Sequence, residues 1–205
     1  MIFLPALLTG LAMSAGLIAS IGAQNMFVLR QGLRRQHVAA VVLFCVASDS
    51  LLVLAGVYGL GEMLSLVPGL KVALSVGGAA FLLWYAFGAF RRATRSSSLV
   101  VGGGSGLSFA AAMTAVAAFT LLNPHVYIDT VMLMGAVGSS LPVGERPSFV
   151  IGATLFAAFW FSAIGFGARF LAPLFARPLA WRLLDAATGI MMTAIAASLI
   201  YGVLN

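Results

Sequence analysis

The sequence has very few charged residues. Only 8% of its 205 residues are Asp, Glu, Lys or Arg, whereas soluble globular proteins carry about 25%. So few charges cannot cover a water-facing surface, so most of the exterior must face lipid. Backbone polar groups can be satisfied in lipid only within helices or closed barrels. The apolar runs here are much longer than the roughly ten-residue alternating segments of a barrel. We therefore predict an all-α integral membrane protein.

Residue types that carry enzymatic chemistry are also scarce. Cys45 is the only cysteine, which excludes an intrachain disulfide and a thiolate metal cluster. The HExxH, GxSxG and phosphate-loop motifs are absent, and no length remains for a soluble catalytic domain. We predict no enzymatic activity, no cofactor and no resident metal. The formal charge of +6 comes from Lys and Arg between the apolar runs, which indicates membrane topology rather than nucleic-acid binding.

Six apolar stretches are long enough to cross a membrane, because one crossing takes about 20 residues. The first, third and fifth breaks between them each hold at least three basic residues, whereas the second and fourth hold one each. The positive-inside rule places the basic breaks in the cytoplasm and both termini outside. We expect about six transmembrane helices, at residues 2–30, 38–61, 70–90, 107–138, 148–170 and 183–203.

A Gly/Ser-rich linker at 96–106 divides the chain into repeats at 1–95 and 107–205. Each repeat holds three helices, and an odd number gives similar halves opposite orientations, as in inverted-repeat transporters. The first and fourth stretches are each about 30 residues long, too long for one straight crossing. Both contain a polar interruption, at 20–25 and 123–125. We predict that the first and fourth helices are broken and that the binding site lies between the breaks.

The second interruption predicts a helix that restarts inside the membrane. Pro124 suits the first position of a helix, and Asn123 before it is a favoured N-cap. In the first stretch Gln24 and Asn25, which follow Gly22, can play the same part. A helix N-terminus at membrane depth favours an anion such as a carboxylate. The alternative is a packing kink whose backbone groups are satisfied by neighbouring hydroxyls and water.

Two carboxylates lie within the apolar stretches. Asp49 is near the middle of the second stretch, and Asp129 follows Pro124 by five residues, with Tyr127 between them. A carboxylate at the bilayer centre costs about 2.5–3.5 kcal/mol and usually marks an ion or substrate path. The alternatives are a structural hydrogen-bonding role for Asp49 and an interface anchor for Asp129. Carboxylates together with helix N-termini suit a solute that carries both charges, such as a cationic amino acid.

His125 is a candidate proton relay, because imidazole titrates near neutral pH, although a hydrogen-bonding role is the alternative. Asp49 is the second candidate for proton coupling. The helix breaks are assigned to Gly22 and Pro124. The predicted substrate-binding residues are Gln24, Asn25, Asp49, Asn123, Tyr127 and Asp129.

These residues resemble the L-lysine exporter family over nearly the whole chain. The segments that carry the resemblance are Ile21-Gly22-Ala23-Gln24-Asn25, residues 30–34, Ser48-Asp49, residues 77–85 and residues 122–129, Leu-Asn-Pro-His-Val-Tyr-Ile-Asp. The resemblance implies secondary-active export of L-lysine or L-arginine across a bacterial inner membrane, driven by protons or the membrane potential. The family usually has proline where this chain has Ala23, which leaves the geometry of the first break open.

Two other readings stay open at this level. In the first, the protein exports another solute, such as a neutral amino acid or a divalent metal cation. In the second, it is a membrane scaffold that transports nothing. The expected partners are the solute, protons and the lipid bilayer. The residues do not decide between lysine and arginine, and self-association into a homo-oligomer also stays open.

Overall fold

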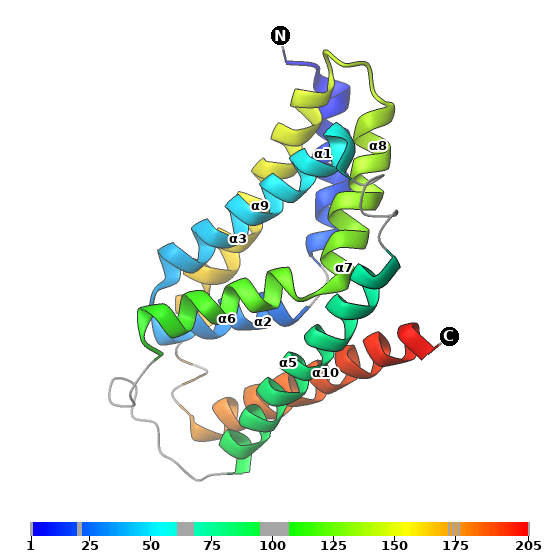
Figure 1. Ribbon diagram of the computed structural model, residues 1–205. Coiled ribbons are helices and arrows are strands. Elements are labelled where there is room, and N and C mark those ends of the chain that lie inside the picture. The colour runs from blue at the N-terminus through cyan, green and yellow to red at the C-terminus, as the bar shows by residue number, and fades with distance from the viewer. Residues whose placement is uncertain are drawn as a thin grey trace.

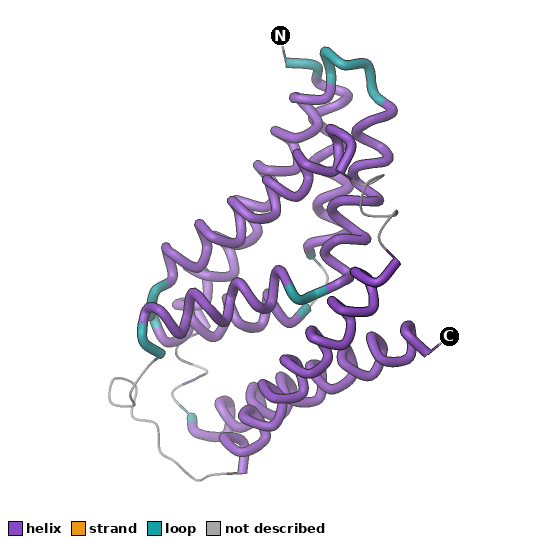
Figure 2. The backbone as a smooth tube through the Cα atoms, in the orientation of Figure 1, coloured by secondary structure: helices purple, strands orange, loops and turns teal. Residues whose placement is uncertain are grey.

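The computed structural model describes residues 2–19, 22–60, 68–94, 107–171, 173, 175 and 177–204. Within these ranges every regular element is a helix, and there is no strand (Figure 2). The all-α prediction is therefore confirmed. The predicted linker at 96–106 lies outside the described residues.

The helices follow the predicted apolar stretches closely. The first three stretches form α1 (Leu4–Ile18), α2 (Ala23–Arg34), α3 (Val38–Ala55) with the π-helical turn η1 (Gly56–Leu60), and α5 (Pro68–Thr94). The last three form α6 (Phe109–Leu121), α7 (Pro124–Val126), the π-helical η2 (Tyr127–Leu133), α8 (Met134–Ser140), α9 (Arg146–Gly167), the 3₁₀ turn η3 (Ala168–Leu171) and α10 (Pro178–Leu204).

Several of these helices are long and apolar enough to cross a membrane. Three meet both criteria among the described residues, at Val38–Gly59, Arg146–Leu171 and Leu179–Gly202, and the number rises to five when each of two bent helix pairs is one span. The chain is thus a multi-pass helical membrane protein. The count of six crossings and their orientation remain predictions.

The first and fourth stretches are both broken, as the polar interruptions predicted. The axes of α1 and α2 differ in direction by 83°, and those of α6 and the helix from Pro124 to Ser140 by 58°. Both breaks lie near the middle of the molecule (Figure 2). Each broken stretch thus gives two shorter helices, whose adjoining ends lie near the middle of the molecule.

The helix ends that flank the three basic breaks lie on the same side of the molecule. In Figure 1, α2, α5 and α9 end and α3, α6 and α10 begin towards the lower left, while α1 begins and α8 ends at the top. The positive-inside rule assigns the lower-left end to the cytoplasm. The α5–α10 pair diverges from the other helices towards the lower right (Figure 1).

Glycines allow the helix backbones to touch at two matching places. A Cβ atom added at Gly10 of α1 would meet the carbonyl oxygen of Phe149 in α9, and one at Gly152 of α9 would meet that of Leu7. Likewise, a Cβ atom at Gly56 would meet the backbone of Val131 in η2. Such close approach is the usual way for helices to associate within lipid.

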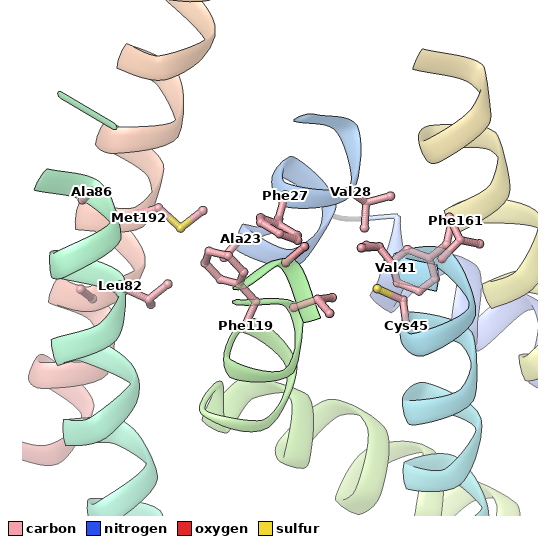
Figure 3. Packing of buried hydrophobic residues seen from close by; sticks show 14 of the residues in the cluster. Ala23, Phe27, Val28, Val41, Cys45, Leu82, Ala86, Phe119, Phe161 and Met192 are labelled. Atoms are coloured by element: carbon pink, nitrogen blue, oxygen red, sulfur yellow. The ribbon is translucent and has the colours of Figure 1, made fainter. Parts of the chain in front are cut away.

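Around the breaks, a buried apolar cluster joins the half-helices α2 and α6 to the α5–α10 pair on one side and to α3 and α9 on the other. Figure 3 shows Phe27 and Phe119, from the two broken helices, between Leu82 of the α5–α10 pair and Phe161 of α9. The ring centroids of Phe27 and Phe119 lie 5.3 Å apart. The half-helices α2 and α6 are thereby fixed against each other beside the breaks.

Candidate functional site

A cavity of about 510 Å³ lies between the two helix breaks. This volume is within the range of small-molecule sites. The structure brings most of the predicted site residues to its wall, although they come from three different helices. The predicted residues that line it are Gly22, Gln24, Asn25, Asp49, Asn123, His125 and Asp129. Their roles remain predictions.

The second break has the local geometry that its sequence predicts. Asn123 is extended, with φ −94° and ψ 107°, and its side-chain oxygen accepts a hydrogen bond from the backbone N–H of His125 at 3.1 Å. Pro124 follows at the first helical position and is buried. Asn123 is therefore an N-cap, and a new helix begins inside the apolar layer.

The first break is held by a different contact. Gly22 is also extended, with φ −109° and ψ 177°, and precedes α2 without a side chain that could cap it. Instead, Nδ2 of Asn25 donates to the carbonyl oxygen of Ile18 at 2.9 Å. This bond ties the start of α2 to the end of α1, so one function of Asn25 is to hold the break together.

Asp49 places a buried carboxylate at the cavity wall. It is 6% exposed, and no salt bridge to it is found among the described residues. The neighbouring hydroxyls do not engage it: Ser48 donates to the carbonyl oxygen of Phe44 at 2.7 Å, and Ser50 to that of Val46 at 2.6 Å. The structure therefore does not pair Asp49 with these serines. The other structural alternative, a hydrogen bond to the broken first helix, stays open, because Gln24 of α2 lies beside Asp49.

The side chain of Gln24 lies beside Asp49 and Cys45. Its Nε2 atom is buried, and in the described part of the chain it has no partner in good hydrogen-bond geometry. A buried amide donor next to a carboxylate usually forms a hydrogen bond or contacts a bound molecule. Gln24 therefore has an amide donor that can contact a molecule bound in the cavity.

Asp129 is the second carboxylate of the cavity, and it is less buried than Asp49. His125 is exposed and lies near enough to Asp129 for an electrostatic interaction. Tyr127 does not line the cavity. Its hydroxyl donates to the carbonyl oxygen of Leu121 at 2.9 Å, which braces the end of α6 against the restarted helix.

The arrangement offers little to a metal ion. Among the described residues no three His, Cys, Asp or Glu side chains are grouped closely enough to hold one. The divalent-metal alternative would need several such ligands around one point. The described cavity instead offers two carboxylates, side-chain amides and the N-termini of two helices.

Comparison with known proteins gives the family of the chain. The family model for LysE type translocators matches residues 15–203. The chain belongs to the LysE type translocator family. It is similar to the arginine exporter proteins ArgO of Serratia proteamaculans, with 38% identity over 94% of both chains, and of Yersinia enterocolitica, with 39% identity over 94% of both. No solved structure matches the chain.

A putative amino-acid transporter of Mycobacterium bovis is 41% identical over 86% of this chain and 88% of its own length. These relatives are named as exporters and transporters, so this LysE-type chain is a translocator and not an enzyme. The family resemblance inferred from the sequence is thereby confirmed.

Sequence reasoning missed the burial of two charged residues, Arg30 and Asp185. Asp185 of α10 is 3% exposed and forms salt bridges with Arg30 of α2 and Arg92 of α5. A signal was present, because Asp185 lies within the sixth apolar stretch, where an acidic residue is as unusual as in the second. Its partners are far away in the sequence, so the pairing itself could not be predicted.

Proposed function

We propose that this protein exports a basic amino acid, L-arginine or L-lysine, from the bacterial cytoplasm across the inner membrane. One observation carries the proposal. Asp49 and Asp129 line the same cavity as the N-termini of two helices, and neither carboxylate has a salt bridge to a basic residue in the described part of the chain. The cavity therefore has acceptors for a cation and donors for an anion.

Each end of a basic amino acid finds a complementary group here. The side-chain cation pairs with Asp49 or Asp129, because ionised acceptors give the stronger hydrogen bonds. The α-carboxylate is bound at a helix N-terminus. The N-terminus of α2 is the better candidate, since Gly22 leaves it uncapped, whereas Asn123 already caps the second helix. Gln24 supplies a further donor beside Asp49.

Arginine is the first substrate to test. Two relatives that match over almost the whole chain are named as arginine exporters. A guanidinium can also bind two carboxylates through its several N–H groups, which an ammonium does with less directional preference. Lysine is the second substrate, and a neutral amino acid would leave both carboxylates without a partner.

The helix packing supports an architecture of six crossings in two inverted repeats. In the first repeat the broken helix packs through α1 on α9, which is the second helix of the other repeat. In the second repeat the broken helix packs through η2 and α8 on α3 and η1. The third helices, α5 and α10, pack on each other. Such reciprocal pairing suits alternating access, in which one half moves against the other.

Export of a cation must work against the membrane potential. Moving one positive charge out of a negative interior costs about 2.3 kcal/mol per 100 mV. Exchange with one or more incoming protons offsets that cost. Asp49 and His125 are the groups proposed to carry the proton, because both face the cavity.

The test is efflux of radiolabelled arginine, lysine and leucine from preloaded bacteria. Wild type should speed arginine or lysine efflux over empty vector and leave leucine unchanged. Asp49→Asn should reduce that efflux at least about tenfold, because an uncharged amide gives up a charge-assisted bond worth about 1.5–3 kcal/mol. Glu145→Gln, between α8 and α9 and outside the described cavity wall, is the matched control and should export normally.

Each other outcome points to a different function. Efflux of all three solutes at the empty-vector rate would contradict the proposal and favour a wider solute screen or a scaffold role. Full activity of Asp49→Asn, at equal abundance in the membrane, would show that the carboxylate is not part of substrate recognition.

A further inference from the structure

Three charged side chains from three helices meet away from the cavity. Nη1 of Arg30 in α2 lies 2.5 Å from Oδ1 of Asp185 in α10, and Nε of Arg92 in α5 lies 3.2 Å from the same oxygen. The side chains of Arg30 and Asp185 are 7% and 4% exposed, and that of Arg92 is 36% exposed. We call these residues the charge cluster.

The charge cluster lies between the cavity and the cytoplasmic end of the molecule. Arg30 is five residues beyond Asn25 of the cavity wall, towards the end of α2. Arg92 is close to the end of α5, and Asp185 is close to the beginning of α10. These helix ends lie at the lower left of Figure 1, where the basic breaks are.

The charge cluster joins two parts of the fold that share only a limited interface. Helices α5 and α10 pack extensively on each other and touch α2, α6 and α7 at far fewer points. Near the cavity that interface is made by aromatic rings, with Tyr85 of α5 4.8 Å from Phe119 of α6 and 6.5 Å from Phe27 of α2. In the described part of the chain, the only salt bridges across it are those of the charge cluster.

The geometry of the cluster suits a contact that opens and closes. Both arginines share a single carboxylate oxygen, and Nη2 of Arg92 is buried without a hydrogen-bond partner in the described residues. A buried ion pair contributes little net stability, because desolvation offsets the attraction, but removing one partner is strongly unfavourable. Such a contact adds little to the stability of the fold, but it can stabilise one of two conformations relative to the other.

We propose that the charge cluster is a cytoplasmic latch of the transport cycle. When closed, it holds the α5–α10 pair against α2 and blocks the route from the cytoplasm to the cavity. When Asp185 separates from Arg30 the latch opens, and a solute can enter the cavity from the cytoplasm. This inference rests on the proposed alternating-access transport, but not on the identity of the solute.

The latch is tested by the accessibility of the cavity from the cytoplasmic side. Thr130→Cys in a Cys45→Ala chain places one thiol at the cavity wall, on a helix outside the α5–α10 pair. Inverted membrane vesicles expose the cytoplasmic face to a membrane-impermeant maleimide, and the initial labelling rate is measured without any amino acid present.

Asp185→Asn should raise that rate on the order of tenfold or more, because it leaves Arg30, Arg92 and the neighbouring Arg34 without their counter-charge. Arg30→Gln should have a smaller effect, because Arg92 remains as a partner, and Arg92→Gln a smaller one still. Asp185→Glu should keep labelling slow. Arg91→Gln is the matched control, since the Arg91 guanidinium lies over the ring of Phe87 and outside the cluster.

Two results would overturn the latch. The first is an equal labelling rate for Asp185→Asn and Arg91→Gln. The second is equally faster labelling of Ala153→Cys in the Cys45→Ala, Asp185→Asn chain, because Ala153 is buried in a core cluster away from the cavity and general loosening of the fold would then explain the effect. A chain that exports neither arginine nor lysine but shows the expected labelling pattern would refute the proposed substrate and leave the latch standing.

Discussion

The contact between α1 and α9 allows a substitution test with a control on the same helix. A Cβ atom at Gly10 would overlap the carbonyl oxygen of Phe149, whereas one at Gly16 would meet nothing within 4 Å. The obstacle at Gly10 is backbone, so it cannot rotate aside as a side chain would. Gly10→Ala therefore forces the two helices apart, and Gly16→Ala does not.

The expected difference follows from two opposing terms. Replacing a helical glycine by alanine gains about 0.5–1 kcal/mol of helix stability, and both variants receive this gain. Only Gly10→Ala also overpacks the interface, which costs about 1–3 kcal/mol. The two variants should thus differ by about 1–3 kcal/mol in stability. For a chain of this length, each kcal/mol corresponds to about 2–4 °C in melting temperature.

The buried cysteine supplies the assay. Cys45 is fully buried, so a dye that becomes fluorescent on reaction with thiols reports unfolding of the purified protein in detergent as temperature rises. Gly16→Ala should melt at or slightly above the wild-type temperature, and Gly10→Ala several degrees below it. If Gly10→Ala melts at the same temperature as Gly16→Ala, the backbone contact between α1 and α9 does not exist as described.

Two further predictions concern the first break. Ala23→Pro should keep export and raise stability by about 0.4–1 kcal/mol, because proline at the first helical position loses no hydrogen bond and restricts the unfolded chain; the same melting assay and arginine efflux measure both effects. Asn25→Ala should lower stability by about 1 kcal/mol and slow efflux, because it removes the bond to the Ile18 carbonyl that ties α2 to α1; an unchanged melting temperature would contradict this role.

The breaks could be predicted because their causes are local. Asn123 and Pro124 carry the N-cap and the first helical position within two residues, and the structure has both as expected. Asp49 was also recognisable, since a carboxylate in an apolar run is costly unless something compensates it. These inferences needed only the chemistry of neighbouring residues and the length of the apolar runs.

Contacts between distant segments could not be predicted in the same way. Arg30 and Asp185 are separated by 155 positions, and nothing in the pattern around either residue indicates the other. Gly10 and Gly152 likewise stand in ordinary apolar runs, and only the crossing of α1 with α9 shows why neither has a side chain. Tyr127 was expected at the cavity because of its place in the sequence, but its hydroxyl donates to the carbonyl oxygen of Leu121 instead.

The first break forms here with Ala23 at the position where the family resemblance implies a proline. Ala23 is the first residue of α2, and Gly22 before it already has the extended backbone that a following proline would impose. The break therefore depends on Gly22 and on the bond from Asn25 to Ile18, not on a ring at position 23. Proline would restrict the backbone further, but α2 begins at the cavity wall without it. The cavity consequently has an uncapped helix N-terminus as well as two carboxylates, and the proposed binding of an amino acid depends on this combination.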